Sequence, residues 1–267
     1  MAHLRIEEKL CIGCAKCVKV CPFNALEMDG DVARVNERCT DCGACVDECP
    51  VDAIVLDRPE AVGGMDLEAY RGVWVAVETQ DGAPAHVSLE LLGQGRELAD
   101  DLDVPLSALL AGSGVADGAD ELIAHGADVV HLVEHPLLER YNTDGYVKVA
   151  AELIERYKPE IVLFGATNNG RDWAGALATR LGTGLTADCT GLTIDRDERR
   201  LLQTRPAFGG NIMATIITPR HRPQMATVRP KVFPVRPAPD HEGRVVREEV
   251  DLVDTDLLAV LKEFIPS

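Results

Sequence analysis

The sequence has few aromatic residues, a deficit of basic residues relative to acidic ones, and no long hydrophobic run. Aromatic residues make up 4% of the 267 residues, which is too few to suggest a surface on which bases stack. The 44 Asp and Glu residues outnumber the 27 Lys and Arg residues, and the formal net charge of −17 disfavours binding to a phosphate backbone. We therefore expect no nucleic-acid partner.

The sequence also lacks the signals of export and membrane insertion. No stretch approaches the ~18 apolar residues that a membrane-spanning helix needs. The first nine residues contain no apolar core of a secretory signal. Eight of the nine cysteines fall in one repeated pattern with Cys189 left over, which fits a reducing compartment. These observations predict a cytoplasmic protein without a membrane span.

Two copies of one cysteine motif occupy the first fifty residues. Residues 11–22 and 39–50 both read C-x2-C-x2-C-x3-C-P, the spacing by which bacterial ferredoxins hold [4Fe–4S] clusters. In that arrangement the fourth cysteine of each motif binds the other cluster. We therefore predict two crossed ligand sets, which are Cys11, Cys14, Cys17 and Cys49 for one cluster and Cys39, Cys42, Cys45 and Cys21 for the other.

Structural zinc and a disulfide framework are the alternatives for these cysteines. Zinc normally takes two pairs of ligands separated by a wide gap, whereas each copy here places three thiols within seven residues. Disulfides would require an oxidising compartment. The complete duplication favours iron–sulfur clusters, and hence a protein that transfers electrons.

The pattern of the chain changes after the duplicated motif. Residues 1–58 are predicted to form a two-cluster α+β unit, in which each motif is followed by a short apolar strand, at 25–28 and 53–56. Residues 59–71 are predicted as a linker because they contain Pro59 and a Gly-Gly pair at 63–64.

Strands alternate with helices from Gly72 onward. Apolar runs at 73–77, 104–111, 129–133 and 161–164 predict buried strands, and the segments between them have helical spacing. Such alternation predicts an α/β domain with a doubly wound, mainly parallel sheet over residues 72–236. Beyond Thr186 the sequence predicts a hairpin around the turn 195–199 and further strands at 212–218 and 225–228. Residues 237–267 are interpreted as a connecting arm.

Two glycine-rich segments resemble phosphate-binding motifs but depart from them. Gly112 and Gly114 follow a predicted strand, yet the third glycine of G-x-G-x-x-G is replaced by Asp117. Residues 165–170 have the spacing of a P-loop, but Arg171 and Asp172 replace its Lys and Ser/Thr. We interpret the second segment as a strand-to-helix turn capped by Asp172.

No pair of nucleophile and base emerges from the remaining sequence. The seven histidines are scattered, and Cys189 is predicted to be a buried small side chain. We therefore identify no catalytic residues.

Four segments are similar to the N-terminal domain of electron-transfer flavoprotein α subunits: residues 162–167, 172–189, 204–211 and 224–230. The resemblance covers residues 73 to about 237. A ferredoxin-like extension ahead of such a domain resembles the α subunits of bifurcating acyl-CoA reductase and lactate dehydrogenase complexes.

The resemblance implies several cofactors and partners. It implies a heterodimer with a β subunit that holds FAD or AMP, an acyl-CoA dehydrogenase or reductase as a further partner, and electron exchange with a soluble ferredoxin. It also implies that NADH oxidation drives electron bifurcation in the complex. Family members continue into a second domain that binds FAD, whereas the sequence ends at Ser267 without its S-G-x-x-Q-H-type motif. We therefore expect a truncated chain that holds no flavin by itself.

A binding module is the alternative function. In that interpretation the ferredoxin unit is fused to an adenine-nucleotide-binding α/β domain that senses nucleotide or redox state. The incomplete glycine motifs weaken this hypothesis.

Overall fold

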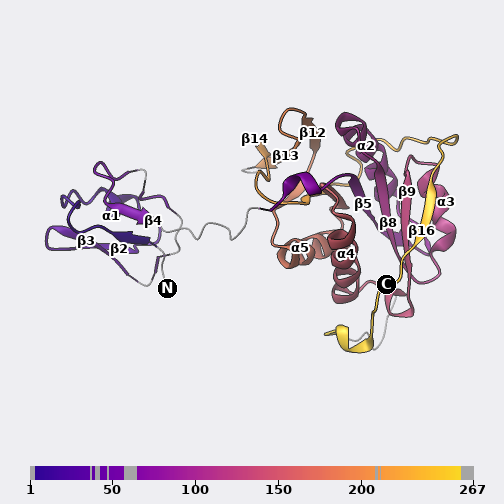
Figure 1. The fold of residues 1–267 in the computed structure, drawn as a ribbon, viewed down its shortest axis with the longest axis horizontal. Coiled ribbons are helices and arrows are strands. Elements are labelled where there is room, and N and C mark those ends of the chain that lie inside the picture. Colours follow the sequence, from indigo (N-terminus) through magenta and orange to yellow (C-terminus); the bar gives the residue numbers. More distant parts are fainter. Residues whose placement is uncertain are drawn as a thin grey trace. The chain divides into compact units, whose positions relative to one another are not determined.

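The computed structural model describes residues 4–36, 38–39, 43–46, 48–56, 65–207, 210 and 212–259. The chain divides into two compact units, Met1–Gly64 and Met65–Ser267, which Figure 1 shows as ribbons. Cys42, residues 59–64 of the predicted linker and residues 260–267 of the predicted arm lie outside the described residues. No helix in the described part of the chain is long and apolar enough to cross a membrane.

The first unit is built from two antiparallel strand pairs and one short helix. Strand β1 pairs with β4, and β2 pairs with β3. The two strands predicted after the cysteine motifs are β2 and β4, and each pairs with a strand that precedes a motif. The elements are β1 Leu4–Ile6, α1 Lys16–Val20, β2 Leu26–Asp29, β3 Val32–Val35 and β4 Ile54–Leu56.

The second unit contains a seven-stranded parallel sheet in the order β11-β15-β10-β5-β8-β9-β16. This confirms the predicted α/β class. The strands are β5 Val73–Val77, β8 Leu106–Gly112, β9 Val129–Glu134, β10 Ile161–Gly165, β11 Leu185–Cys189, β15 Gln224–Val228 and β16 Arg244–Arg247.

Helices cover both faces of this sheet, as Figure 1 shows. Alternate side chains of a strand point to opposite faces, so Val73, Val75 and Val77 pack with α2 and α3, whereas Trp74 and Ala76 pack with α4 and α5. The helices are α2 His86–Leu102, α3 Ala119–Ile123, α4 Thr143–Tyr157 and α5 Asn168–Leu181, and the short 3₁₀ helices are η1 Leu67–Ala69, η2 Ala116–Gly118, η3 Pro136–Leu138 and η5 Asp254–Asp256.

The cap predicted for α5 is wrong. The N-cap residue is Thr167, whose Oγ1 accepts a hydrogen bond from the Gly170 N–H at 2.9 Å. Asp172 lies inside the helix, where its carboxylate accepts from the hydroxyl groups of Tyr141 and Thr143, at the start of α4. A residue within the first turns of a helix can accept from neighbouring elements, but it is too far along the chain to cap the first N–H groups.

A three-stranded antiparallel sheet follows β11. It contains the predicted hairpin, β12 Gly191–Asp195 and β13 Arg200–Ala207, and β14 Ile212–Ile216 at its edge. The chain then returns to the main sheet, where β15 inserts between β10 and β11. A two-residue ladder, β6 Thr79–Gln80 with β7 Ala83–Pro84, completes the second unit.

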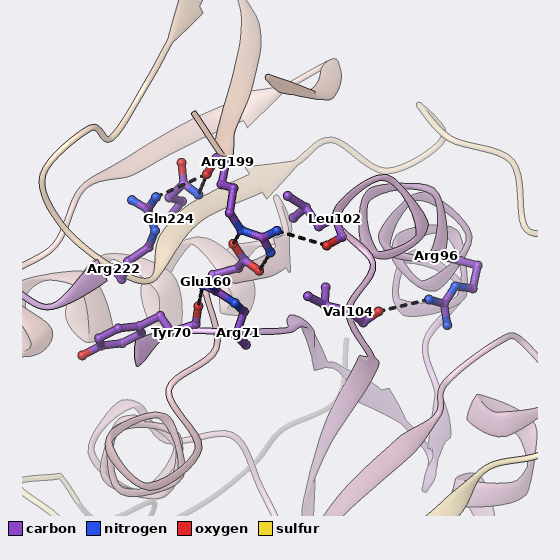
Figure 2. Close-up of polar contacts among 9 residues, drawn as sticks. All are labelled: Tyr70, Arg71, Arg96, Leu102, Val104, Glu160, Arg199, Arg222 and Gln224. Atoms are coloured by element: carbon purple, nitrogen blue, oxygen red, sulfur yellow. Dashed lines mark hydrogen bonds and ion pairs between the residues drawn. The ribbon is translucent and has the colours of Figure 1, made fainter. Parts of the chain in front are cut away.

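A partly buried ion pair joins the small sheet to the main one (Figure 2). Glu160, 1% exposed, precedes β10 and accepts two hydrogen bonds from Arg199 of the β12–β13 turn, at 2.6 and 3.3 Å. Arg199 also donates to the Leu102 carbonyl at the end of α2. Its own carbonyl accepts from Arg222 and from Gln224 at the start of β15. Four segments distant in sequence are thereby held at the amino edge of the parallel strands.

We predict that Glu160→Gln destabilises the second unit by roughly 2–4 kcal/mol, because the Arg199 guanidinium loses its carboxylate in a largely buried site. Urea unfolding followed by tryptophan fluorescence measures this unit alone, since both tryptophans, Trp74 and Trp173, lie in it. Glu198→Gln is the matched control, because Glu198 forms a more exposed pair with Arg200 that is worth less than about 1 kcal/mol. Equal midpoints for the two variants would contradict the prediction.

Candidate iron–sulfur site

Strand pairing brings the end of each cysteine motif next to the beginning of the other. Ile6, at the end of β1, pairs with Ile54, at the start of β4, so the chain leading to Cys11 and the chain leaving Cys49 lie at the same end of the ladder. In the same way Leu26 of β2 pairs with Val35 of β3. This places the segments of Cys21 and Cys39 together at one end of that ladder.

Two hollows in the first unit are lined by these cysteines. Ile6, Ala33 and Ile54 contribute apolar walls to one hollow, and Leu4 and Leu26 contribute them to the other. The cysteines of the first hollow are Cys11, Cys14, Cys17 and Cys49, and the described cysteines of the second are Cys21, Cys39 and Cys45. The structure thus groups the described cysteines as the predicted ligand sets do, while the ligation itself stays a prediction.

The fourth cysteine of each motif has the same backbone environment. The Ala25 N–H donates to Cys21 Sγ at 3.2 Å, and the Ala53 N–H donates to Cys49 Sγ at 3.3 Å. The residue before each alanine adopts a left-handed conformation, with φ of 50° at Asn24 and 51° at Asp52. An N–H···S contact favours the thiolate over the thiol, so both sites are preorganised for a metal-bound sulfur.

Sequence reasoning missed these two N–H donors. Their signal is present as the repeated C-P-x-[N/D]-A at residues 21–25 and 49–53. Asn and Asp tolerate the left-handed conformation better than other non-glycine residues. The sequence therefore contains the turn that aims each alanine N–H back at the sulfur.

The arrangement of the cysteine thiols suits a metal cluster better than a single metal ion. No three His, Cys, Asp or Glu side chains in the described part of the chain lie close enough together to hold one metal ion. A tetrahedral zinc would require thiolates at about 2.3 Å from one centre, whereas a cubane presents separate iron corners to its ligands. Burial raises the pKa of the Cys17 thiol, and so do Cys11 and Cys14 nearby. A thiolate at Cys17 therefore needs a cation, and a donor set of four cysteines fits a [4Fe–4S] cluster.

The other candidate residues from the sequence, Cys189 and the two glycine-rich segments, lie in the second unit. Cys189 is completely buried, as predicted, and burial raises the pKa of its thiol to about 12, which makes it unreactive. The two incomplete glycine motifs both lie at the carboxyl edge of the parallel sheet, after β8 and β10.

The fold and the cysteine-rich unit together define an iron–sulfur electron-transfer protein. A family model described as a 4Fe-4S dicluster domain matches residues 3–50, which indicates two [4Fe–4S] clusters. A model described as the electron transfer flavoprotein domain matches residues 73–255. The chain belongs to the electron transfer flavoprotein family, and its second unit is of the α-subunit type.

Curated relatives share the second unit and continue beyond the matched region. The chain is 47% identical over 202 residues to electron transfer flavoprotein subunit alpha of Thermoanaerobacterium thermosaccharolyticum, covering 74% of this chain and 61% of the relative. It is 48% identical over 196 residues to the subunit of the same name in Clostridium acetobutylicum, covering 72% and 58%. Protein FixB of Azorhizobium caulinodans is 44% identical over 207 residues, covering 75% and 55%. The chain thus spans less than two thirds of the length of these relatives.

We predict that Gly13→Ala speeds the thermal loss of cluster absorbance more than Gly30→Ala does. Both glycines have positive φ, +69° and +63°, so both variants carry a backbone cost of about 1–2 kcal/mol. At Gly13, between Cys11 and Cys14, a Cβ would also lie 2.9 Å from the Asp31 carbonyl oxygen, whereas at Gly30 it would meet open space. Equal or faster bleaching of Gly30→Ala would refute this account.

Proposed function

We propose that this chain is the α-type subunit of a flavoprotein complex and relays single electrons between a flavin and a soluble ferredoxin or dehydrogenase. The observation that supports this proposal is that one chain contains both an eight-cysteine two-cluster unit and an electron transfer flavoprotein domain. When bound, a [4Fe–4S] cluster supplies one-electron chemistry. Two such clusters suit a step that divides the electron pair of a flavin into single electrons.

The cluster ligation that we propose follows the two hollows. Cys11, Cys14, Cys17 and Cys49 would hold one cluster, and Cys39, Cys42, Cys45 and Cys21 the other. The N–H groups of Ala25 and Ala53 would donate to the fourth sulfur of each set, as they do in the structure. Hydrogen bonds to cluster sulfurs and solvent exposure are general determinants of reduction potential.

The partner that we propose is a β subunit that carries FAD. The relatives are named subunit alpha, which implies further subunits in those proteins. In this chain the edge strand β14 exposes apolar side chains, with Ile212 and Met213 each 55% exposed and Ile216 39% exposed. Alternate side chains point to opposite faces, so Met213 lies on one face of β14 and Ile212 and Ile216 on the other. An edge strand with exposed apolar side chains is suited to pairing with another chain. We propose that β14 contacts the β subunit.

The reaction that we propose for the complete complex is bifurcation. NADH oxidation at the β-subunit flavin would drive the reduction of both ferredoxin and an acyl-CoA reductase-type acceptor. In this scheme the second unit of the chain is a scaffold without catalytic residues, and the chemistry belongs to the flavins and the partner enzyme.

Paired variants of the fourth cysteines test the ligation and the relay together. Anaerobically purified wild-type protein should contain about eight iron and eight acid-labile sulfide atoms per chain. Cys49→Ala should lose the EPR signal of one cluster and Cys21→Ala that of the other, and each variant should retain about half of the iron. In the complex with the β subunit, both variants should slow ferredoxin reduction while flavin reduction by NADH stays at the wild-type rate.

Three results would overturn these proposals. Stoichiometric zinc with little sulfide would refute the clusters. Loss from Cys49→Ala of the cluster that Cys39 and Cys45 hold would refute the crossed ligand sets. Wild-type rates of ferredoxin reduction in both variants, with half of the iron gone, would refute the relay.

We predict that Met213→Asp weakens association with the β subunit by more than about tenfold, because a charge would replace an apolar side chain in the interface. Val253→Asp is the control, since Val253 is similarly exposed, at 47%, but lies outside the three-stranded sheet. Sedimentation or calorimetry with the purified β subunit measures both affinities. Identical affinities for the two variants would show that β14 is not the contact.

A further inference from the structure

A cavity of about 500 Å³ lies at the carboxyl edge of the parallel sheet, within the range of small-molecule sites. From β5 the chain runs to β8 and β9 on one side, and then crosses to β10 on the other. The crevice at such a reversal of strand order is where open α/β sheets bind ligands. The cavity is lined by residues that follow β5, β8 and η3, and by the first turns of α5. All of its described lining residues belong to the second unit.

Glu78, which follows β5, places its carboxylate in this crevice beside the start of α5. Its Oε2 accepts from the hydroxyl of Thr167, the N-cap residue, at 2.6 Å. Its Oε1 lies where a Cβ on Gly165 or Gly170 would come within 2.5 and 2.9 Å. The two glycines therefore leave room for a carboxylate at the helix N-terminus, the position at which phosphates bind in related folds.

Two buried polar atoms of the cavity walls lack a partner. Glu78 Oε1, an acceptor, and Trp173 Nε1, a donor, have no hydrogen-bond partner among the residues that the structure describes, and an organic cation, which only donates, could serve the acceptor alone. Trp173 is 1% exposed, and both residues line the cavity. Burial raises the pKa of the Glu78 carboxyl, as expected for an acceptor that lacks a donor. A buried acceptor without a partner costs about 1–3 kcal/mol, and a ligand donor offsets this cost only if the Glu78 carboxylate turns Oε1 toward the cavity.

The charge and the aromatic residues of the cavity indicate which kind of ligand it would bind. Among its described lining residues, the carboxylates of Glu78, Asp81 and Glu139 outnumber the one guanidinium, that of Arg140. Of the three aromatic residues that line it, Tyr141 is half-buried, whereas Tyr146 and Trp173 are 8% and 1% exposed. Carboxylates repel a phosphoryl group, whereas carboxylates beside aromatic faces attract an organic cation.

We propose that this crevice binds a small organic cation, an ammonium or guanidinium group that donates to Glu78 and lies against the aromatic wall. Glu78 has two roles in this proposal. It supplies the unpartnered acceptor, and it occupies the α5 N-terminus so that nucleotides are excluded. The site is independent of the clusters and of the electron relay.

Agmatine, which carries both an ammonium and a guanidinium group, is the probe, and AMP is the anionic counterpart. Calorimetry on the full chain should show saturable, one-to-one binding of agmatine and none of AMP. Glu78→Gln should weaken agmatine binding by about tenfold or more, the equivalent of one charged hydrogen bond. Glu198→Gln, a carboxylate outside the cavity, should leave it unchanged. The indole N–H resonance of Trp173, identified with Trp173→Phe, should shift on binding.

Asp81→Asn/Glu139→Gln provides a second variant if Glu78→Gln does not fold, because both side chains are exposed at the rim. Removing two carboxylates should weaken agmatine binding several-fold, with a reduced dependence on salt. Absence of saturable agmatine binding, wild-type affinity in the variants that alter the cavity, or one-to-one binding of AMP to the wild-type chain would each overturn the proposal.

Discussion

The antiparallel pairing of β1 with β4 is the constraint on which the cysteine-rich unit depends. β1 precedes the first motif and β4 follows the second, so their pairing closes the duplicated chain on itself and brings Cys49 to the hollow of Cys11, Cys14 and Cys17. The buried apolar cluster of the unit is small and includes Cys17 and Cys45 themselves. Because the predicted ligands are part of the core, folding and cluster binding should be coupled in this unit.

Two glutamates with different surroundings lie at opposite edges of the main sheet of the second unit. At the amino edge Glu160 is fully paired, with Arg199, and the network joins four segments. At the carboxyl edge Glu78 keeps one buried oxygen without a partner among the described residues. A satisfied buried network specifies how elements pack, whereas an unsatisfied one beside a cavity indicates a ligand. Arg222 Nε at the amino edge also lacks a partner among the described residues, so what distinguishes the carboxyl edge is the cavity beside its unpartnered oxygen.

Periodicity predicted the strands whose burial is simple, and it predicted β15 as a strand at 225–228 without its place in the main sheet. The apolar run 73–77 is β5, and the runs predicted at 104–111, 129–133 and 161–164 correspond to β8, β9 and β10. The return of β15 to the main sheet could not be predicted, because its Gln224 and Thr227 are buried and satisfied by distant segments: Gln224 contacts the β12–β13 hairpin, and Thr227 accepts from Asp188. The cysteine spacing predicted the candidate site, since ligand spacing within a loop is local in sequence. The N–H donors at Ala25 and Ala53 depend on turn geometry and were missed.

Glycine spacing proved ambiguous for a physical reason at residues 165–170. A glycine-rich turn between a strand and a helix removes Cβ atoms so that an anion can approach the helix N-terminus. In nucleotide-binding proteins the anion is a phosphate, but here the Glu78 carboxylate lies 87 and 92 residues away from the two glycines in sequence and fills the same space. The motif therefore indicates that an anion is accommodated, not which one. The anion here is Glu78 because β5, which the chain leaves at Glu78, lies beside β10. That is a property of sheet order, which the spacing of the glycines does not contain.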